Sequence, residues 1–473
     1  MSLTNADDRL HRSPRASSPD GRAHAAARAA LIAGLVGLYG IVGADSRWLA
    51  ALGRYVVLRG AVPRGVPFAG SPTTHWANTL VLAELIFHWL EAAFGDRGLV
   101  LAQTLAVGLA LYSLARDAGG GNDEARGVGI ALAITVLGSI SSLAIARVQM
   151  FSLVLFPVLA ALLRAEHRDP SQRIWLSLPL LALWSNLHGA VISGLVVLYG
   201  YLLLDRIRHD PRTTIAMALL APAAICVTPA FLRSLDYYHG LVTNVAVQRG
   251  EGQWAPLGTG PLDLLLIGAV IVLALPLARR TPPLWESAVL LVFAILTVKA
   301  SRDGVWLLFF LVVPCAKAGG PLPIMRDRGL RARAVRWLPM TASVAVFGSV
   351  LLVYDVFIRP TPRSGASLSM VAAAIRVANG TPILADSQAG EQIALAGGRI
   401  WAGNPLDAFS RKVQAEYLNW TGGAAAGGAI LRNSRVRVVL VAPGGGADRL
   451  TIADQSFRRI ASGPTSVLYE RVR

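Results

Sequence analysis

Apolar residues along this chain gather in runs of membrane-spanning length, and short polar segments rich in arginine separate them. A helix needs roughly 20 mostly apolar residues to cross the hydrocarbon core of a bilayer. The pattern therefore predicts an α-helical polytopic membrane protein with about eleven transmembrane helices. These are expected at about 29–44, 98–115, 127–146, 149–163, 174–187, 190–204, 213–229, 262–278, 286–300, 304–318 and 337–353.

Composition supports this class. Hydrophobic residues make up 54% of the chain and charged residues 15%, with a mean hydropathy of +0.51, which is more apolar surface than a water-soluble core of this length can bury. The net charge of +17 would suggest nucleic acid in a soluble protein, but the arginines lie mostly between apolar runs, as expected for contact with anionic lipid headgroups. Cys226 and Cys315 both lie inside apolar runs, which indicates neither a disulfide nor a metal site.

Loop charges predict the topology, because short loops rich in Lys and Arg stay in the cytoplasm. Residues 1–28 are expected to form a disordered cytoplasmic tail, and 29–354 a transmembrane domain in a bacterial cytoplasmic membrane. Residues 45–97 would then be a first outer loop carrying two interfacial helices, at 48–58 and 78–94. In an alternative threading, 78–94 spans the membrane and every later loop changes side.

Beyond Tyr354 the chain becomes less apolar and predicts a small extracytoplasmic α/β domain over 355–473. A Pro-Gly-Gly-Gly run at 443–446 is expected to be a turn, since it lacks the Lys-Ser/Thr of a phosphate loop. Asp386, Glu391 and Asp407 are candidates for an acidic site without metal-ligand spacing. Strands are expected at 382–384, 436–441 and 466–469, and helices at 365–378, 388–396 and 408–432.

Asp45 directly follows the first apolar run, where a membrane helix is expected to meet water. An ionisable residue at that depth is a functional candidate. The alternative is an ordinary helix-end Asp that pairs with Arg47 or caps the next helix. The outer loop also carries four arginines that the topology rule does not place there, which indicates either a local anion or contact with lipid phosphates. These are Arg47, Arg54, Arg59 and Arg64.

Other polar groups interrupt the apolar runs at turns expected on the same face as Asp45. Asn186 and His188 lie in a Trp-Ser-Asn-Leu-His-Gly turn at 184–189, and Arg302 lies in a turn with Lys299 and Asp303. Arg147 and Gln149 contribute a third turn. No comparable set of His, Trp and acidic residues is expected on the inner face.

The first loop resembles that of bacterial membrane proteins in the GT-C glycosyltransferase superfamily. The resemblance rests on Asp45-Ser46-Arg47-Trp48, Leu52-Gly53-Arg54, Gly60-Ala61-Val62-Pro63, Pro67-Phe68 and Trp76, and extends to the turn at 183–189 and to the C-terminal domain, as in one poorly characterised branch. It implies an enzyme that uses lipid-phosphate-linked sugars, with its loop acid at Asp45. Related loops often carry a second acid near the Pro-Phe pair, where this chain has Gly65-Val66, which argues against a two-carboxylate or metal-assisted scheme.

The resemblance thus implies an inverting glycosyltransferase that moves a sugar from a polyprenyl-phosphate-linked donor to a glycan, lipid or protein acceptor at the outer face. Asp45 is the expected base, and phosphate or substrate binding is expected from Arg47, Arg54, Asn186, His188 and Arg302. Membrane lipids are expected partners; nucleic acid, metals and cofactors are not. Two alternatives stay open: a transporter, which the scarcity of charges within the spans disfavours, and a non-catalytic scaffold whose outer domain binds a partner.

Overall fold

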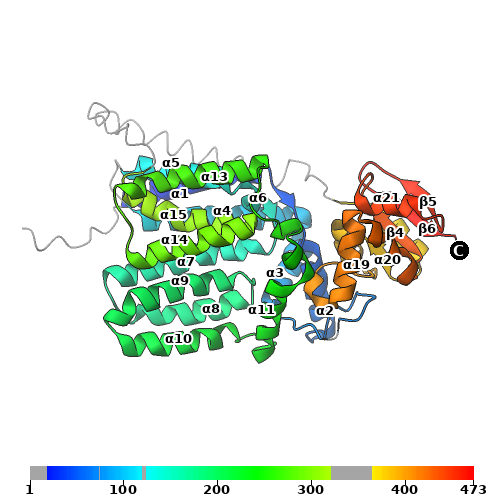
Figure 1. The fold of residues 1–473 in the computed structure, drawn as a ribbon, viewed down its shortest axis with the longest axis horizontal. Helices are drawn as coiled ribbons and strands as arrows, with labels where there is room; N and C mark the ends of the chain where they lie inside the picture. The colour runs from blue at the N-terminus through cyan, green and yellow to red at the C-terminus, as the bar shows by residue number, and fades with distance from the viewer. Residues whose placement is uncertain (1–18, 74, 120–123, 321–364, 473) are drawn as a thin grey trace, which may run out of the picture.

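The computed structural model describes residues 19–73, 75–119, 124–320 and 365–472. It is a bundle of long helices with a small α/β domain at one end (Figure 1). The bundle consists of α1 (Pro19–Gly37), α4 (Asp96–Ala118), α5 (Glu124–Gly138), α7 (Gln149–Arg168), α8 (Ser177–Ser185), α9 (Val191–Leu204), α10 (Pro211–Ile225), α13 (Pro261–Ala274), α14 (Leu284–Lys299) and α15 (Gly304–Lys317). The expected span at 337–353 and the first part of the expected tail, 1–18, lie outside the described residues.

Within those residues, three helical stretches are both long and apolar enough to cross a membrane by themselves: Asp96–Ala118, Gln149–Arg168 and Pro261–Ala278. Shorter apolar helices accompany them, including Gly127–Gly138 and Pro211–Ile225. The helical membrane fold is therefore confirmed, while the number of spans, about eleven, stays a prediction.

Two expected helices end early. The first stops at Gly37 instead of residue 44, and the one expected over 127–146 stops at Gly138, before the short α6 (Ile140–Leu143). Residues beyond the ends of these two helices instead pair as the parallel strands β1 (Ile41–Val42) and β2 (Ile145–Ala146). Gly43 permits this approach, since a Cβ there would lie 2.2 Å from Ile145 Cγ2. At its other end, the first helix begins at Pro19 within the expected disordered tail, where an Ala-rich sequence favours helix.

Two amphipathic helices cover the end of the bundle that faces the C-terminal domain. They are α2 (Ser46–Arg59) and α3 (Val81–Phe94), close to the expected interfacial helices. In α2, Trp48, Leu49 and Leu52 are buried, because the helical period of 3.6 places them on one face. The two helices pack closely at Gly53, where a Cβ would lie 2.0 Å from the Glu84 carbonyl oxygen.

The C-terminal domain is a four-stranded sheet of order β3-β4-β6-β5, in which β3 and β4 are parallel and the other pairs antiparallel. Its strands are β3 (Ile383–Ala385), β4 (Val438–Val441), β5 (Phe457–Ser462) and β6 (Val467–Arg471), and its main helices are α17 (Leu368–Ala378), α18 (Ser387–Leu395), α19 (Arg411–Gly422), α20 (Gly428–Asn433) and α21 (Gly446–Ala453). The α/β architecture agrees with expectation. The sequence missed β5, and the helix expected at 408–432 is divided into α19 and α20.

The first loop joins this domain to the bundle through its backbone. Ile400 N–H donates to the Phe68 carbonyl at 2.9 Å, and Gly70 N–H donates to the Ile400 carbonyl at 2.6 Å. Further along the interface, Gln414 of α19 accepts from the Val245 N–H at the start of α12 (Val245–Arg249) at 3.0 Å. Because α18 also packs on α2, the domain is held over the residues that follow Asp45.

Candidate functional site

Asp45 is the residue immediately before α2, and it does not directly follow the first long helix as expected, because that helix ends at Gly37. Its φ of 82° lies in the left-handed region, where a residue with a side chain is strained unless its surroundings hold it. The side chain is half-buried, and its Oδ1 accepts a hydrogen bond from the Trp48 indole at 3.2 Å. Within the described residues its Oδ2 accepts no hydrogen bond, so one carboxylate oxygen remains available to a ligand.

Glu391 of α18 contacts the backbone around Asp45. Its Oε1 accepts from the Asp45 N–H at 2.9 Å and from Asn404 Nδ2 at 2.8 Å, while its Oε2 accepts from the Arg47 N–H at 3.3 Å. The side chain is buried, with 2% of its surface exposed. Burial, and then the negative charge of Asp45, raise the pKa of Glu391 to about 8 against the opposing effect of these N–H donors.

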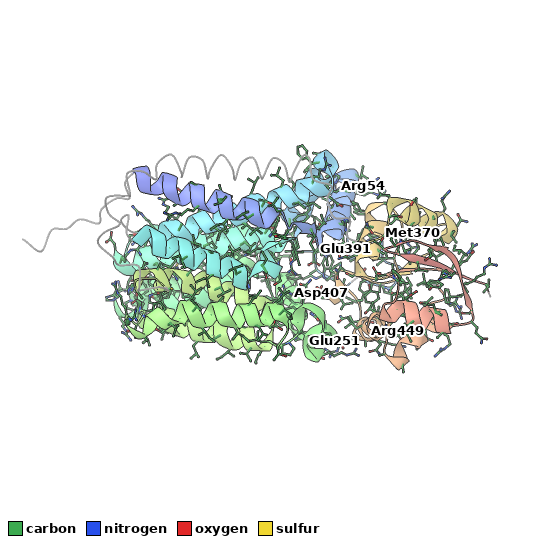
Figure 2. The ribbon with its side chains drawn as sticks, turned by 90° about the horizontal axis from the view of Figure 1, so that it is seen from above. Arg54, Glu251, Met370, Glu391, Asp407 and Arg449 are labelled. Atoms are coloured by element: carbon green, nitrogen blue, oxygen red, sulfur yellow. The ribbon has the colours of Figure 1, made fainter. Side chains whose placement is uncertain are left out.

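A second carboxylate of the C-terminal domain, that of Asp407, also lies near Asp45. Its Oδ2 accepts from the Trp76 indole at 2.9 Å, and Trp76 packs edge-to-face on Trp48 with 6.3 Å between ring centroids. Burial raises the pKa of Asp407, and the charge of Asp45 adds to the shift. Figure 2 shows Glu391 and Asp407 where the C-terminal domain meets the bundle. Asp45, Glu391 and Asp407 therefore form an acidic cluster. Two tryptophans of the first loop bind carboxylates of this cluster: Trp48 binds Asp45, and Trp76 binds Asp407.

Arg147 and Arg302 line a cavity of about 370 Å³ beside this cluster, together with serines 139, 141, 142 and 301 and Asp263. Arg147, before α7, is 9% exposed, and its Nε has no hydrogen-bond partner among the described residues. Burial and then the charge of Arg302 lower the pKa of Arg147 to about 10, whereas Asp45 raises it. Neither arginine forms an ion pair in the described structure, and Arg302 stacks on the Trp254 ring at 4.6 Å.

A buried guanidinium without an ion-pair partner is costly, so Arg147, with the half-buried Arg302 at the same cavity, favours binding of an anion. Guanidinium groups bind phosphate oxygens through paired hydrogen bonds. Asp45 lies close enough to influence the charge of Arg147. The arrangement therefore combines a carboxylate that can accept a proton with a cationic cavity that can hold a phosphate.

His188 lies in the turn between α8 and α9 and contacts this region from the bundle. Its Nδ1 is 2.6 Å from Ser152 Oγ, which also accepts from the Trp184 indole at 2.6 Å. Burial lowers the pKa of His188 to about 3, and Arg302 and Arg147 act in the same direction. His188 is thus neutral near pH 7. Ser152 Oγ and His188 Nδ1 share one hydrogen bond, whose direction depends on the tautomer of the neutral imidazole.

Three other residues expected in the site have different surroundings. Arg47 is buried and pairs with Asp96 at 2.9 Å, and exposed Arg54 donates to the Leu395 carbonyl at 3.3 Å. Asn186 donates to the carbonyls of Ala182 at 2.8 Å and Val227 at 2.6 Å. All three are bound to protein groups, and none lines the cavity.

The sequence pointed to the acids of the C-terminal domain but not to their approach to Asp45. The structure brings Glu391 and Asp407 to Asp45, whereas Asp386 caps α18 through the Ala389 N–H at 3.0 Å and binds the Ala442 N–H at 2.7 Å. Buried Tyr237 of α11 (Ser234–Thr243) also faces the cluster, and the charge of Asp407 helps to raise the pKa of its hydroxyl. Among the described residues, no group of three or more His, Cys, Asp and Glu side chains is arranged to hold a metal ion.

Comparison with known proteins gives a structural likeness without a close sequence relative. No family model matches the chain, and no curated protein matches it. The solved structure of ArnT from Cupriavidus metallidurans in the apo state is similar to it at 13% identity, with a TM-score of 0.50, over 93% of this chain and 96% of that chain. The structure of the same protein bound to undecaprenyl phosphate is similar at 14% identity, with a TM-score of 0.49 and the same coverage. At this identity the likeness shows the fold alone: the chain has the helical fold of ArnT, in agreement with the fold that the resemblance of its first loop led us to expect.

Proposed function

We propose that this protein is a membrane glycosyltransferase that moves a sugar from a polyprenyl-phosphate-linked donor to an acceptor at the outer face of the cytoplasmic membrane. The observation that carries the proposal is the cavity lined by Arg147 and Arg302, neither of them ion-paired among the described residues, beside the half-buried carboxylate of Asp45. The fold shared with ArnT, whose solved structure contains undecaprenyl phosphate, agrees with a lipid-phosphate ligand.

The chemistry follows from the positions of these groups. The acceptor hydroxyl transfers its proton to Asp45 as its oxygen attacks the anomeric carbon. The bond between that carbon and the phosphate oxygen breaks, and the polyprenyl phosphate leaves with the electron pair. Displacement from the face opposite the phosphate inverts the anomeric configuration. Arg147 and Arg302 stabilise the charge that develops on the leaving phosphate, an effect that is strongest where water is excluded.

The acceptor site is proposed on the side of the aromatic residues. Trp48, whose indole donates to Asp45, packs edge-to-face on Trp76. Tyr237 packs its hydroxyl against the turn that carries His188, since a Cβ on Gly189 would lie 2.8 Å from Tyr237 Oη. Aromatic rings and neutral hydrogen-bond donors are suited to a sugar or another hydroxylated acceptor. Neutral His188 would orient the acceptor and would not bind phosphate as a cation.

Asp45→Asn tests the assignment of the base. Wild-type protein and variant are reconstituted in liposomes made from bacterial lipid extract, and the loss of lipid-linked sugar is followed by mass spectrometry. We expect the rate to fall about 10²–10⁴-fold, since general-base assistance contributes about that much. Asp236→Asn, which changes an exposed acid on α11, is the matched control and is expected to retain the wild-type rate. Full activity of Asp45→Asn would refute the assignment.

A further inference from the structure

Glu391 is an unusual partner for the start of α2, because it belongs to another domain and lies 346 residues away in sequence from Asp45. The first N–H groups of a helix have no partner within the helix, and a neighbouring side chain of the same segment usually accepts from them. Asp45 precedes α2 but its side chain forms no capping hydrogen bond. Glu391 takes that role by accepting from the N–H groups of Asp45 and Arg47.

This contact also holds the strained backbone of Asp45. A φ of 82° is unfavourable for a residue with a side chain and persists where the surroundings determine it. The Glu391 carboxylate accepts from the Asp45 N–H, and the Trp48 indole donates to Oδ1 of the Asp45 side chain. Together these bonds fix both the backbone and the carboxylate of Asp45.

Glu391 is itself held in place by its own domain. Asn404 donates to Glu391 Oε1 at 2.8 Å and lies 3.1 Å from Ser387 Oγ at the start of α18. The backbone bonds between 68–71 and 400–401 set the position of this segment against the first loop. Docking of the C-terminal domain therefore determines where the Glu391 carboxylate lies relative to Asp45.

We propose that Glu391 is a positioning residue for the transfer reaction: from the C-terminal domain it caps the first turn of α2, fixes the geometry of Asp45, and makes the activity of the membrane domain depend on domain docking. The inference rests on the proposed function and adds a residue that does not touch the reacting atoms. A carboxylate misplaced by about 1 Å can cost on the order of 10²-fold in rate, so this contact has a measurable consequence.

The charge of Glu391 gives the proposal a pH signature. The titratable groups that face it are Asp45 and Arg47 on the α2 side and Tyr417 of α19. Because burial, and then the charge of Asp45, raise the pKa of Glu391 to about 8, Glu391 is neutral below that pH and ionises above it. Ionisation buries a second negative charge beside Asp45, so the wild-type rate is expected to fall as the pH rises through about 8. Glu391→Gln removes the ionising group and is expected to lack this alkaline limb. A Glu391 without influence on Asp45 would leave the limb in place.

The experiment uses full-length protein and compares Glu391→Gln with a matched control, Glu470→Gln. Glu470 lies in the same domain and pairs with exposed Arg437 at 2.9 Å, away from Asp45. In Glu391→Gln one amide hydrogen atom must face a backbone N–H, because the present carboxylate accepts at both oxygens. Hydrogen–deuterium exchange of peptides that contain residues 45–52 measures the start of α2 without any need for activity.

We expect faster exchange in this segment for Glu391→Gln, a fall in kcat of roughly 10–100-fold with little change in KM, and loss of the alkaline limb near pH 8. Asn404→Ala, which frees Glu391 without removing its ionisable carboxyl group, should speed exchange and keep the alkaline limb. Glu470→Gln should match the wild type in every readout.

The outcomes distinguish this inference from the proposed function. Equal exchange and an unchanged alkaline limb in Glu391→Gln would overturn the positioning role even in an active enzyme. Absence of transfer by the wild type at every pH, with the exchange difference intact, would overturn the proposed function and with it the catalytic part of this inference. Its structural part, the cap on α2, would stand.

Discussion

The Trp76 indole nitrogen lies 2.9 Å from Asp407 Oδ2 and donates a hydrogen bond from the first loop to the C-terminal domain. The two residues are 331 positions apart, so this bond exists only when the domain is docked. Together with the bonds from Glu391 to the start of α2, it attaches the acidic cluster to the end of the helix bundle. The strength of docking can therefore be changed by single substitutions.

Trp76→Phe is expected to weaken docking, because the ring contact with Trp48 remains while the donor to Asp407 is lost. A hydrogen bond to a charged group contributes about 1.5–3 kcal/mol, and we expect a loss of stability of this order. Denaturant unfolding in detergent measures it. Trp175→Phe is the control, since its indole donates to exposed Gln172. Equal effects of the two substitutions would contradict a docking role for Trp76.

Stability is expected to depend on pH through Glu391. Its pKa rises from an ordinary 4.5 to about 8 in the folded protein, so the folded state binds more protons than the unfolded state between these values. The stability that protonation supports is complete below about pH 4.5 and is lost as the pH rises through about 8. Thermal unfolding across pH 5–9 should show a declining slope that is smaller in Glu391→Gln. The same slope in both proteins would contradict this account.

Gly53→Ala is expected to separate α2 from α3. The added Cβ would lie 2.0 Å from the Glu84 carbonyl oxygen, and overpacking of this kind typically costs about 1–3 kcal/mol. Gly268→Ala in α13 is the matched control, because a Cβ there meets nothing within 4 Å and alanine favours helix. Thermal unfolding is expected to show a lower melting temperature for Gly53→Ala alone. A lower melting temperature for Gly268→Ala, or an unchanged one for Gly53→Ala, would show that the close packing of α2 on α3 at Gly53 does not determine stability.

The sequence predicted the helical membrane class, the amphipathic helices at 48–58 and 78–94, and the C-terminal α/β domain, because each has a strong local pattern. It did not predict that the first and third long helices end early. Residues 41–42 and 145–146 are apolar enough to continue a helix, and the pairing that makes them strands joins segments far apart in the chain. The edge strand β5 was not predicted, because Arg458 and Arg459 interrupt the alternation of apolar and polar residues that indicates a strand.

In the candidate site, too, the sequence identified some residues and could not identify the contacts of others. Asp45 and Arg302 could be identified because each interrupts an apolar run, and Arg147 appeared in the same set of turns. The approach of Glu391 to Asp45 depends on domain docking, which leaves no short-range signal. Arg47 and Arg54 looked like phosphate ligands, but Asp96 and the Leu395 carbonyl bind them in the structure. Their partners are likewise set by packing between distant segments.

The central claim is that Arg147 and Arg302 bind the phosphate of a polyprenyl-phosphate lipid beside Asp45. Native mass spectrometry of the purified protein with undecaprenyl phosphate tests it most directly, in the wild type, in Arg147→Gln with Arg302→Gln, and in Arg458→Gln, which alters an exposed arginine of β5. We expect the wild type and Arg458→Gln to retain the lipid equally and the double variant to lose it. Absence of binding by the wild type, or equal binding by the double variant, would contradict the account.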